Sequence, residues 1–88
     1  GSDFEIEEFK LTENIDQINN FKSKNDYFFN SSKRDEALLL ATKVAGQLMG
    51  NPKDKISISP GMILIVLGSQ KQLTRIRDHF KEILVKAT

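Results

Sequence analysis

The stretch SISPGMILIVLGSQ, residues 57–70, decides the fold of this 88-residue chain. Its Ser-Pro-Gly-Met start, residues 59–62, fits a type II turn, because Pro60 presets φ at the second position and Gly61 accepts a positive φ at the third. The six residues 62–67 are all apolar, which is typical of a central strand covered on both sides. The stretch therefore predicts a tight turn that leads into a buried strand.

A helix is predicted directly after that strand. Gly68 ends the apolar run, Ser69 is a favoured N-cap, and Gln72 three residues later completes a capping box with it. Apolar side chains then recur at helical spacing, while charged side chains lie elsewhere on the helix. These features predict a helix over residues 69–85 with one apolar face, formed by Leu73, Ile76, Phe80, Ile83 and Leu84.

The first strand is expected in FEIEEFKL, residues 4–11. Its apolar alternation slips phase between Ile6 and Phe9, as a β-bulge at Glu7-Glu8 would cause. A short helix follows, with Thr12 or Asn14 as its cap. The apolar face predicted for this helix consists of Ile15, Ile18 and Phe21.

The middle of the chain contains a polar segment and a hairpin. Residues 22–35 are polar except for the aromatic residues 27–29, so we expect a loop or insertion whose aromatic side chains dock on the core. A hairpin is predicted next, with strands over 37–44 and 47–50 and a turn between them near Ala45-Gly46. The Asn51-Pro52 dipeptide ends it, because proline cannot donate to a strand ladder.

The predicted order of elements is β-α-β-β-β-α, an α+β fold with a small β-sheet and two helices. Residues 3–88 form one domain, near the smallest size at which a single core suffices. Gly1-Ser2 is interpreted as a cloning scar, and the domain as a piece excised from a longer protein.

Composition excludes several classes of protein. The chain has no cysteine, which excludes disulfides and thiolate metal sites. Its formal net charge of +1 gives little support for nucleic acid or an anionic membrane as partner. The longest apolar run is six residues, far short of the ~20 that span a bilayer.

The sequence offers little enzymatic chemistry, and we expect neither a catalytic residue nor a metal site. His79 is the only histidine, so a histidine-based zinc site has no partners, and no G-x-S-x-G or phosphate-binding glycine motif is present. Glu5, Glu7 and Glu8 are interpreted as a solvated strand edge rather than a cation site.

The stretch NPKDKISISPGMILIVLGSQKQLTRIRDHF, residues 51–80, resembles the C-terminal subdomain of RCK (TrkA-C) regulatory units of potassium channels and transporters. The matching features are the Asn51-Pro52 end of the hairpin, the Pro60-Gly61 turn, the apolar strand and the polar start of the helix. FEIEEFKLTEN is similar to the opening strand of the family. Met62 stands where the family usually has Asp, so a side-chain hydrogen bond across the turn is missing. Residues 22–35 are longer and more polar than the family pattern.

The resemblance implies a cytoplasmic regulatory domain on a membrane protein, which pairs as a homodimer and gates ion flux in response to a small molecule or ion. Its ligand would bind at the face shared by two copies, in some members a cyclic dinucleotide and in others Ca²⁺. Leu38, Leu40 and Ser59 occupy the region of that ligand. The pore or transporter subunit would join through the part N-terminal to this chain.

Two functions stay open at this point. One is the ligand-binding regulatory domain, and the other is a purely structural subunit-pairing domain with no ligand. For either, the apolar residues of the hairpin exceed what one sheet face needs, so we expect a dimer contact that includes residues 38–40, Leu48 and Met49.

Overall fold

The computed structural model describes residues 3–25, 28–29, 37–50 and 56–85 of the chain. Within them, four strands form an antiparallel sheet in the order β1-β6-β3-β4. The strands are β1 (Phe4–Lys10), β6 (Ile63–Ser69), β3 (Leu38–Val44) and β4 (Gln47–Gly50). The helices are α1 (Ile15–Asn25) and α2 (Gln70–His79). A separate pair joins β2 (Phe28–Phe29) and β5 (Ile56–Ser57). The predicted α+β fold is confirmed, with two short strands added to the predicted order.

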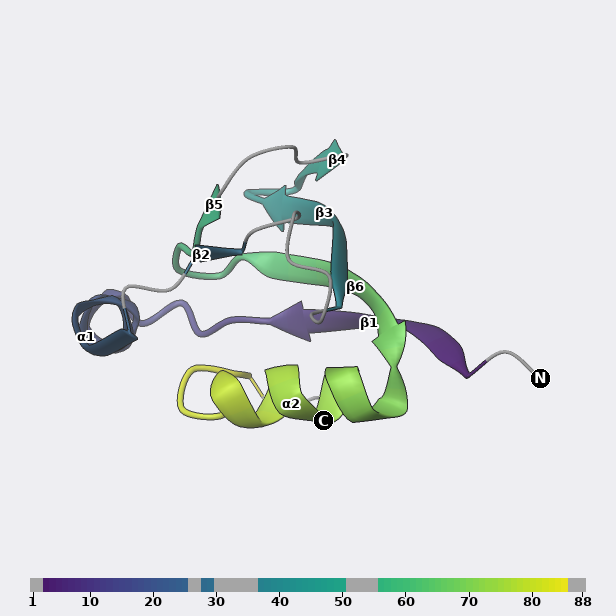
Figure 1. The fold of residues 1–88 in the computed structure, drawn as a ribbon. Coiled ribbons are helices and arrows are strands. Elements are labelled where there is room, and N and C mark those ends of the chain that lie inside the picture. Colours follow the sequence, from purple (N-terminus) through teal and green to yellow (C-terminus); the bar gives the residue numbers. More distant parts are fainter. Residues whose placement is uncertain (1–2, 26–27, 30–36, 51–55, 86–88) are drawn as a thin grey trace.

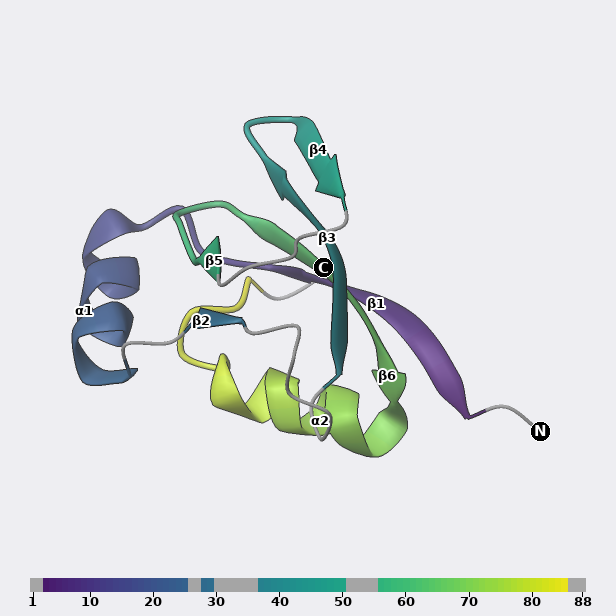
Figure 2. The same cartoon turned by 45° about the horizontal axis from the view of Figure 1, so that its top comes forward.

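The helices gather on one side of the sheet. Figure 1 shows β4, β3, β6 and β1 in succession from top to bottom, with α2 beneath them and α1 at the left end. After the rotation in Figure 2, α1 still lies beside the turn that leads into β6. Residues of both helices join one buried cluster with sheet residues, including Phe9, Leu39, Leu64 and Val66. We call the side of the sheet that carries these residues the core face.

Strand β6 lies inside the sheet, between β1 and β3, as its apolar run predicts. Its residues nevertheless alternate in burial along the strand. Leu64 and Val66 are fully buried on the core face, whereas Ile63, Ile65 and Leu67 are only half-buried. The prediction that this strand is covered on both sides was therefore wrong for one of its two faces.

Strand β1 contains no bulge, contrary to the prediction at Glu7-Glu8. Its seven residues pair with β6 in unbroken register, from Phe4 opposite Ser69 to Lys10 opposite Ile63. Partners in an antiparallel ladder share a face, so the slip in apolar alternation does not come from a bulge. It arises because Phe4 and Ile6 lie on one face of the strand, whereas Phe9 lies on the core face.

The irregularity lies in β3 instead. Leu39 pairs with Val66 and Ala41 pairs with Ile65, so Leu40 is the extra residue of a bulge. An extra residue in one strand preserves pairing on both sides of it while it bends the strand. The bulge thus lets β3 keep Leu39 on the core face.

The turn before β6 has the predicted geometry. Gly61 has φ 72°, and the Met62 N–H donates to the Ser59 carbonyl at 3.2 Å. The Gly61 N–H donates to the Thr12 carbonyl at 2.8 Å, which ties the turn to the end of β1. Met62, the last residue of the turn, is buried in the core, so its side chain contributes apolar packing there.

The predicted cap of α2 is confirmed. The Gln72 N–H donates to the Ser69 hydroxyl at 3.1 Å, and the Ser69 N–H donates to the Gln72 side-chain carbonyl at 2.9 Å. The helix ends at His79, however, and not at residue 85. After turns at residues 80–83, the Thr12 N–H donates to the Ile83 carbonyl at 2.7 Å. Ile83 therefore reaches the core from outside the helix.

Helix α1 is longer than predicted and differently oriented. Asn14 caps it by accepting a hydrogen bond from the Gln17 N–H at 3.1 Å. Ile18 and Phe21 are buried as predicted, but Ile15 is exposed, so its assignment to the apolar face was wrong. The helix continues to Asn25, which corrects the start of the predicted loop, and Phe28 and Phe29 form β2 rather than loop.

The hairpin of β3 and β4 matches its prediction. Ala45 and Gly46 form its turn and have φ 51° and 79°, and two positive φ values are the signature of a type I′ hairpin turn. The two predicted hairpin-ending residues, Asn51 and Pro52, lie outside the described residues, as do Tyr27 and residues 30–36.

Candidate functional site

The second face of the sheet carries apolar side chains that no helix of the described residues covers. We call it the open face. It follows from the register, because residues paired with Ile63, Ile65 or Leu67 point the same way as these residues. Its members are Phe4, Ile6, Glu8 and Lys10 of β1, Ile63, Ile65, Leu67 and Ser69 of β6, Leu38, Ala41 and Lys43 of β3, and Leu48 of β4.

One line of this face is apolar across three adjacent strands. Ile6 pairs with Leu67, and Leu67 pairs with Leu38, so the three side chains lie side by side and form what we call the apolar row. Ile6 is 63% exposed and Leu38 is 45% exposed, although both are large aliphatic side chains. A contiguous exposed apolar surface of this kind marks an interaction site more often than scattered single residues do.

The other end of the open face is basic. Lys10 and Lys43 both pair with Ile63, one from each side, and both are exposed. We call these three residues the lysine row. Glu8 lies between the two rows on β1, opposite Ile65. The open face therefore changes from apolar to charged along the strand direction.

The three predicted ligand residues are not brought together within one copy. Leu38 lies in the apolar row, and Leu40 is the half-buried bulge residue of β3. Ser59 is half-buried in the turn that precedes β6, whereas Leu38 pairs near the far end of that strand. At ~3.3 Å per residue, this places Leu38 and Ser59 on the order of 15 Å apart. Their role in binding a ligand stays a prediction.

The predicted dimer contact is also split by the fold. Leu38 and Leu48 belong to the open face, but Leu39 is buried in the core. Met49 pairs with Thr42, which shares the face of Leu64, so Met49 points away from Leu48. The five hairpin residues therefore do not form one patch, and the members missing from the prediction are Ile6 and Leu67.

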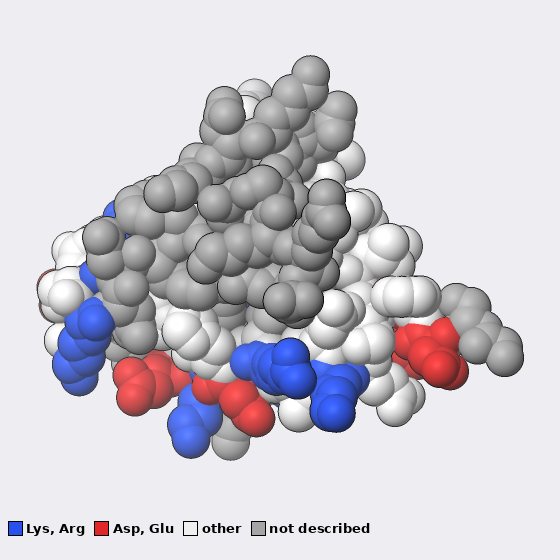
Figure 3. All heavy atoms as spheres, in the orientation of Figure 1, with Lys and Arg blue, Asp and Glu red and all other residues white. Residues whose placement is uncertain are grey.

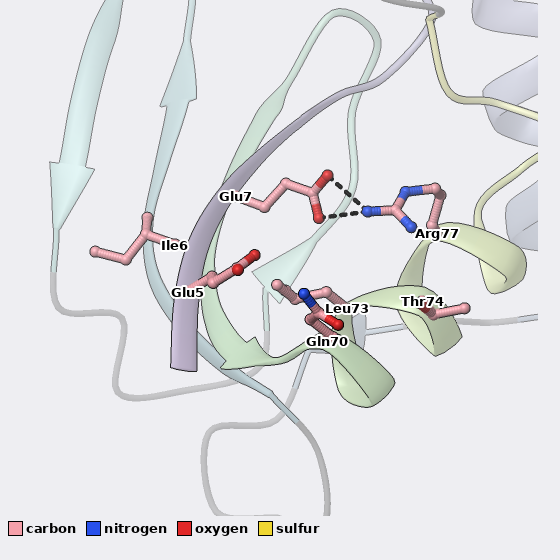
Figure 4. A pocket seen from close by; sticks show the side chains of 7 residues that line it. All are labelled: Glu5, Ile6, Glu7, Gln70, Leu73, Thr74 and Arg77. Carbon is pink, nitrogen blue, oxygen red and sulfur yellow. Dashed lines mark hydrogen bonds and ion pairs between the residues drawn. The ribbon is translucent and has the colours of Figure 1, made fainter. Parts of the chain in front are cut away.

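A cavity of about 430 Å³ lies between β1 and α2. Figure 4 shows Glu5 and Glu7 directed toward α2, while Ile6 points to the other side of the strand. One Arg77 Nη atom donates to both carboxylate oxygens of Glu7 at 2.7 Å. The full lining consists of Glu5, Ile6, Glu7, Gln70, Leu73, Thr74 and Arg77.

The Glu7–Arg77 pair dominates the chemistry of this cavity. Its hydrogen bond, and secondly the attraction of the Glu7 charge, raise the pKa of the Arg77 guanidinium above its ordinary value. The two charges neutralise each other at the cavity wall, and the pair joins β1 to α2. We assign the cavity a structural role, because its strongest polar groups are already partnered.

The three N-terminal glutamates do not converge. The register places Glu5 and Glu7 on the side of α2 and Glu8 on the open face. The described residues contain no group of three or more His, Cys, Asp or Glu side chains that could hold a metal ion. His79 lies at the end of α2. Its ring packs edge-on against the Phe21 ring, with 5.6 Å between the two ring centroids.

Charge is mixed on the visible surface near α2. In Figure 3, Lys and Arg side chains alternate with Asp and Glu along the lower border of the molecule. Alternating signs are typical of a solvated surface rather than a nucleic-acid interface. In the part of the chain that the structure describes, no helix is long and apolar enough to cross a membrane.

No family model, curated protein or solved structure matches this chain. The geometry must therefore be interpreted from its own residues. The surface that sequence reasoning missed is the apolar row, and its signal was present in β1. The phase slip between Ile6 and Phe9 marks apolar residues on both faces, which an edge strand with one solvated face does not need.

Proposed function

We propose that this chain is a cytoplasmic regulatory domain of a potassium channel or transporter, of the RCK C-terminal type. The observation that supports it best is the unit from Ser59 to Gln72. This unit has the positive-φ glycine of the turn, the interior apolar strand and the capped helix start that the family resemblance requires. The domain would pair with a second copy and bias an attached pore or transporter.

The effector is proposed to bind between paired copies. Leu38 and Ser59 lie at different ends of β6, so an effector that contacts both residues would have to extend along the length of the strand. A ligand that spans two copies can favour one dimer geometry, provided that it binds the two states with unequal affinity. A cyclic dinucleotide or Ca²⁺ is the proposed class of effector.

Thermal unfolding with added effector tests this function. The chain is melted alone and with cyclic di-AMP, cyclic di-GMP, ATP or CaCl₂. A ligand at 100 times its Kd stabilises by about 2.7 kcal/mol, which is on the order of 10–20 °C for a domain of this size. We expect one of these probes to raise Tm, and Ser59→Ala to remove the shift. Ser57→Ala, at an exposed position two residues away, serves as the matched control.

The alternative is a structural pairing domain with no ligand. The separation of the predicted ligand residues within one copy favours it, because Leu38 and Ser59 lie near opposite ends of β6. A dimer by light scattering, with no Tm shift from any of the four probes, would support this alternative. A monomer with no Tm shift would contradict both functions.

A further inference from the structure

We propose that the apolar row of the open face is the contact by which two copies of this chain pair, with the twofold axis along the row. The inference rests on the pairing function proposed above and assigns its surface. Each of Ile6, Leu67 and Leu38 would then meet its own counterpart in the second copy.

The composition of the row supports a macromolecular contact. Its three side chains come from three hydrogen-bonded strands, so they form a rigid, continuous strip rather than a flexible loop. Ile65 lies beside the strip and is half-buried, which widens the apolar surface as far as Glu8, its partner on β1. A preorganised aliphatic surface loses little conformational entropy on binding.

The position of the charges favours a second copy as the occupant. Glu8, Lys10 and Lys43 all lie on the same side of the row, toward the start of β6. A twofold axis along the row carries Lys10 and Lys43 to opposite outer ends of the dimer, where they stay in solvent, as at the rim of ordinary interfaces. Glu8 lies one position from the row, opposite the Phe4 and Ser69 end of the second copy, at the border of the contact.

The described residues leave room for this arrangement. Both of their helices pack on the core face, so two sheets can approach through their open faces at the usual separation of about 10 Å. The formal charge of +1 per chain produces little repulsion between copies. Packing centred on the row would cover Leu67 and Ile65, while Ile63, between Lys10 and Lys43, stays at the rim.

Two aspartate variants test the assignment by light scattering. Ile6 and Leu48 are both aliphatic, both on the open face and both 63% exposed, but Leu48 pairs with Lys43 in line with the lysine row. We expect the wild-type chain to have twice the mass of 10.0 kDa. Ile6→Asp should raise the dissociation constant about 30-fold or more, whereas Leu48→Asp should leave it nearly unchanged.

Single cysteines provide a second readout, because the chain has no cysteine of its own. Sheets packed about 10 Å apart hold facing Cα atoms beyond the ~7 Å reach of a disulfide, so a short bismaleimide is used as the cross-linker. We expect it to link Ile6→Cys and Leu38→Cys chains into dimers, and to link few Leu48→Cys chains. A monomeric wild type would overturn both the pairing function and this surface. A dimer that resists Ile6→Asp, or that cross-links equally through Leu48→Cys, would overturn the surface alone and keep the pairing function.

Discussion

The two faces of β6 differ in burial although their residues are almost the same. Leu64 and Val66 are fully buried against the helices, while Ile63, Ile65 and Leu67 on the opposite side are half-buried. Aliphatic character therefore does not decide which face becomes the core. The decision comes from where the helices pack, and the half-buried apolar face is the surface proposed above for pairing.

The largest expected loss of stability distinguishes the two faces of β6 directly. Leu64→Ala removes a side chain with 0% exposure and should lower the free energy of unfolding by about 2–5 kcal/mol. Ile65→Ala, one residue away on the open face, should cost about 1 kcal/mol under conditions where the chain is monomeric. Urea unfolding at low protein concentration measures both. Equal losses would show that the faces are equally covered in one copy.

The next largest loss of stability is expected in the turn that precedes β6. Gly61→Val should cost about 1–3 kcal/mol, because a β-branched residue is strained at φ 72° and its Cβ would lie 3.1 Å from Glu13 Cγ. Gly50→Val is the matched control, since a Cβ there meets nothing within 4 Å, and it should stay within about 0.5 kcal/mol. Unfolding midpoints in urea compare the two, and identical midpoints would contradict the turn geometry.

A smaller effect is expected at the other end of β6, where α2 begins. Ser69→Ala removes the acceptor of the Gln72 N–H and should cost about 1 kcal/mol. Thr74→Ala, at an exposed position within the same helix, should change stability by less than about 0.5 kcal/mol. Thermal melting of both variants measures the difference. A Ser69 variant as stable as the Thr74 variant would mean that the cap does not hold α2 on the core face.

The smallest effect is expected for the Glu7–Arg77 ion pair, which joins β1 to α2. A double-mutant cycle with Glu7→Gln and Arg77→Met should give a coupling of about 0.2–1 kcal/mol, since both groups are partly exposed. The coupling should shrink in about 1 M salt. A coupling that grows with salt would contradict an electrostatic pair.

The pH dependence of the Glu7–Arg77 pair follows from the direction in which the pKa of Arg77 is shifted. A pKa raised in the folded state contributes stability that is complete below the unfolded pKa, and this stability is lost only as pH rises through the folded pKa. For an arginine this window lies at strongly alkaline pH. The Arg77 contribution should therefore stay constant between about pH 6 and pH 9.

Features set by neighbouring residues were predictable from the sequence. The Pro60-Gly61 turn, the Ala45-Gly46 hairpin turn and the Ser69–Gln72 capping box each depend on about four consecutive residues. Local chemistry decides such features, because their hydrogen bonds are made within the same short segment.

Features set by distant contacts were not predictable. The bulge lies at Leu40 rather than at Glu7-Glu8, because the pairing of β3 with β6 determines it. Helix α2 ends at His79 because the following segment turns back, and the Val85 N–H donates to the Lys10 carbonyl at 2.9 Å. Ile15 is exposed because α1 turns Ile18 and Phe21 inward instead.

The candidate site also depends on contacts between residues that are distant in the chain. Leu38 was identified in the sequence, but its neighbours Ile6 and Leu67 come from strands far away in the chain. Only the sheet order brings the three side chains into one row. The sequence could indicate a surplus of apolar residues, and the fold was needed to locate that surplus on one face.

Intermolecular NOEs in a dimer of mixed isotope labelling test the central claim most directly. Half of the chains carry ¹³C-labelled methyl groups and half are unlabelled, so filtered spectra show only contacts between copies. The account predicts NOEs from the methyl groups of Ile6, Leu67 and Leu38 to the same residues of the second copy. Intermolecular NOEs confined to α1, α2 or the Pro60 turn would contradict it.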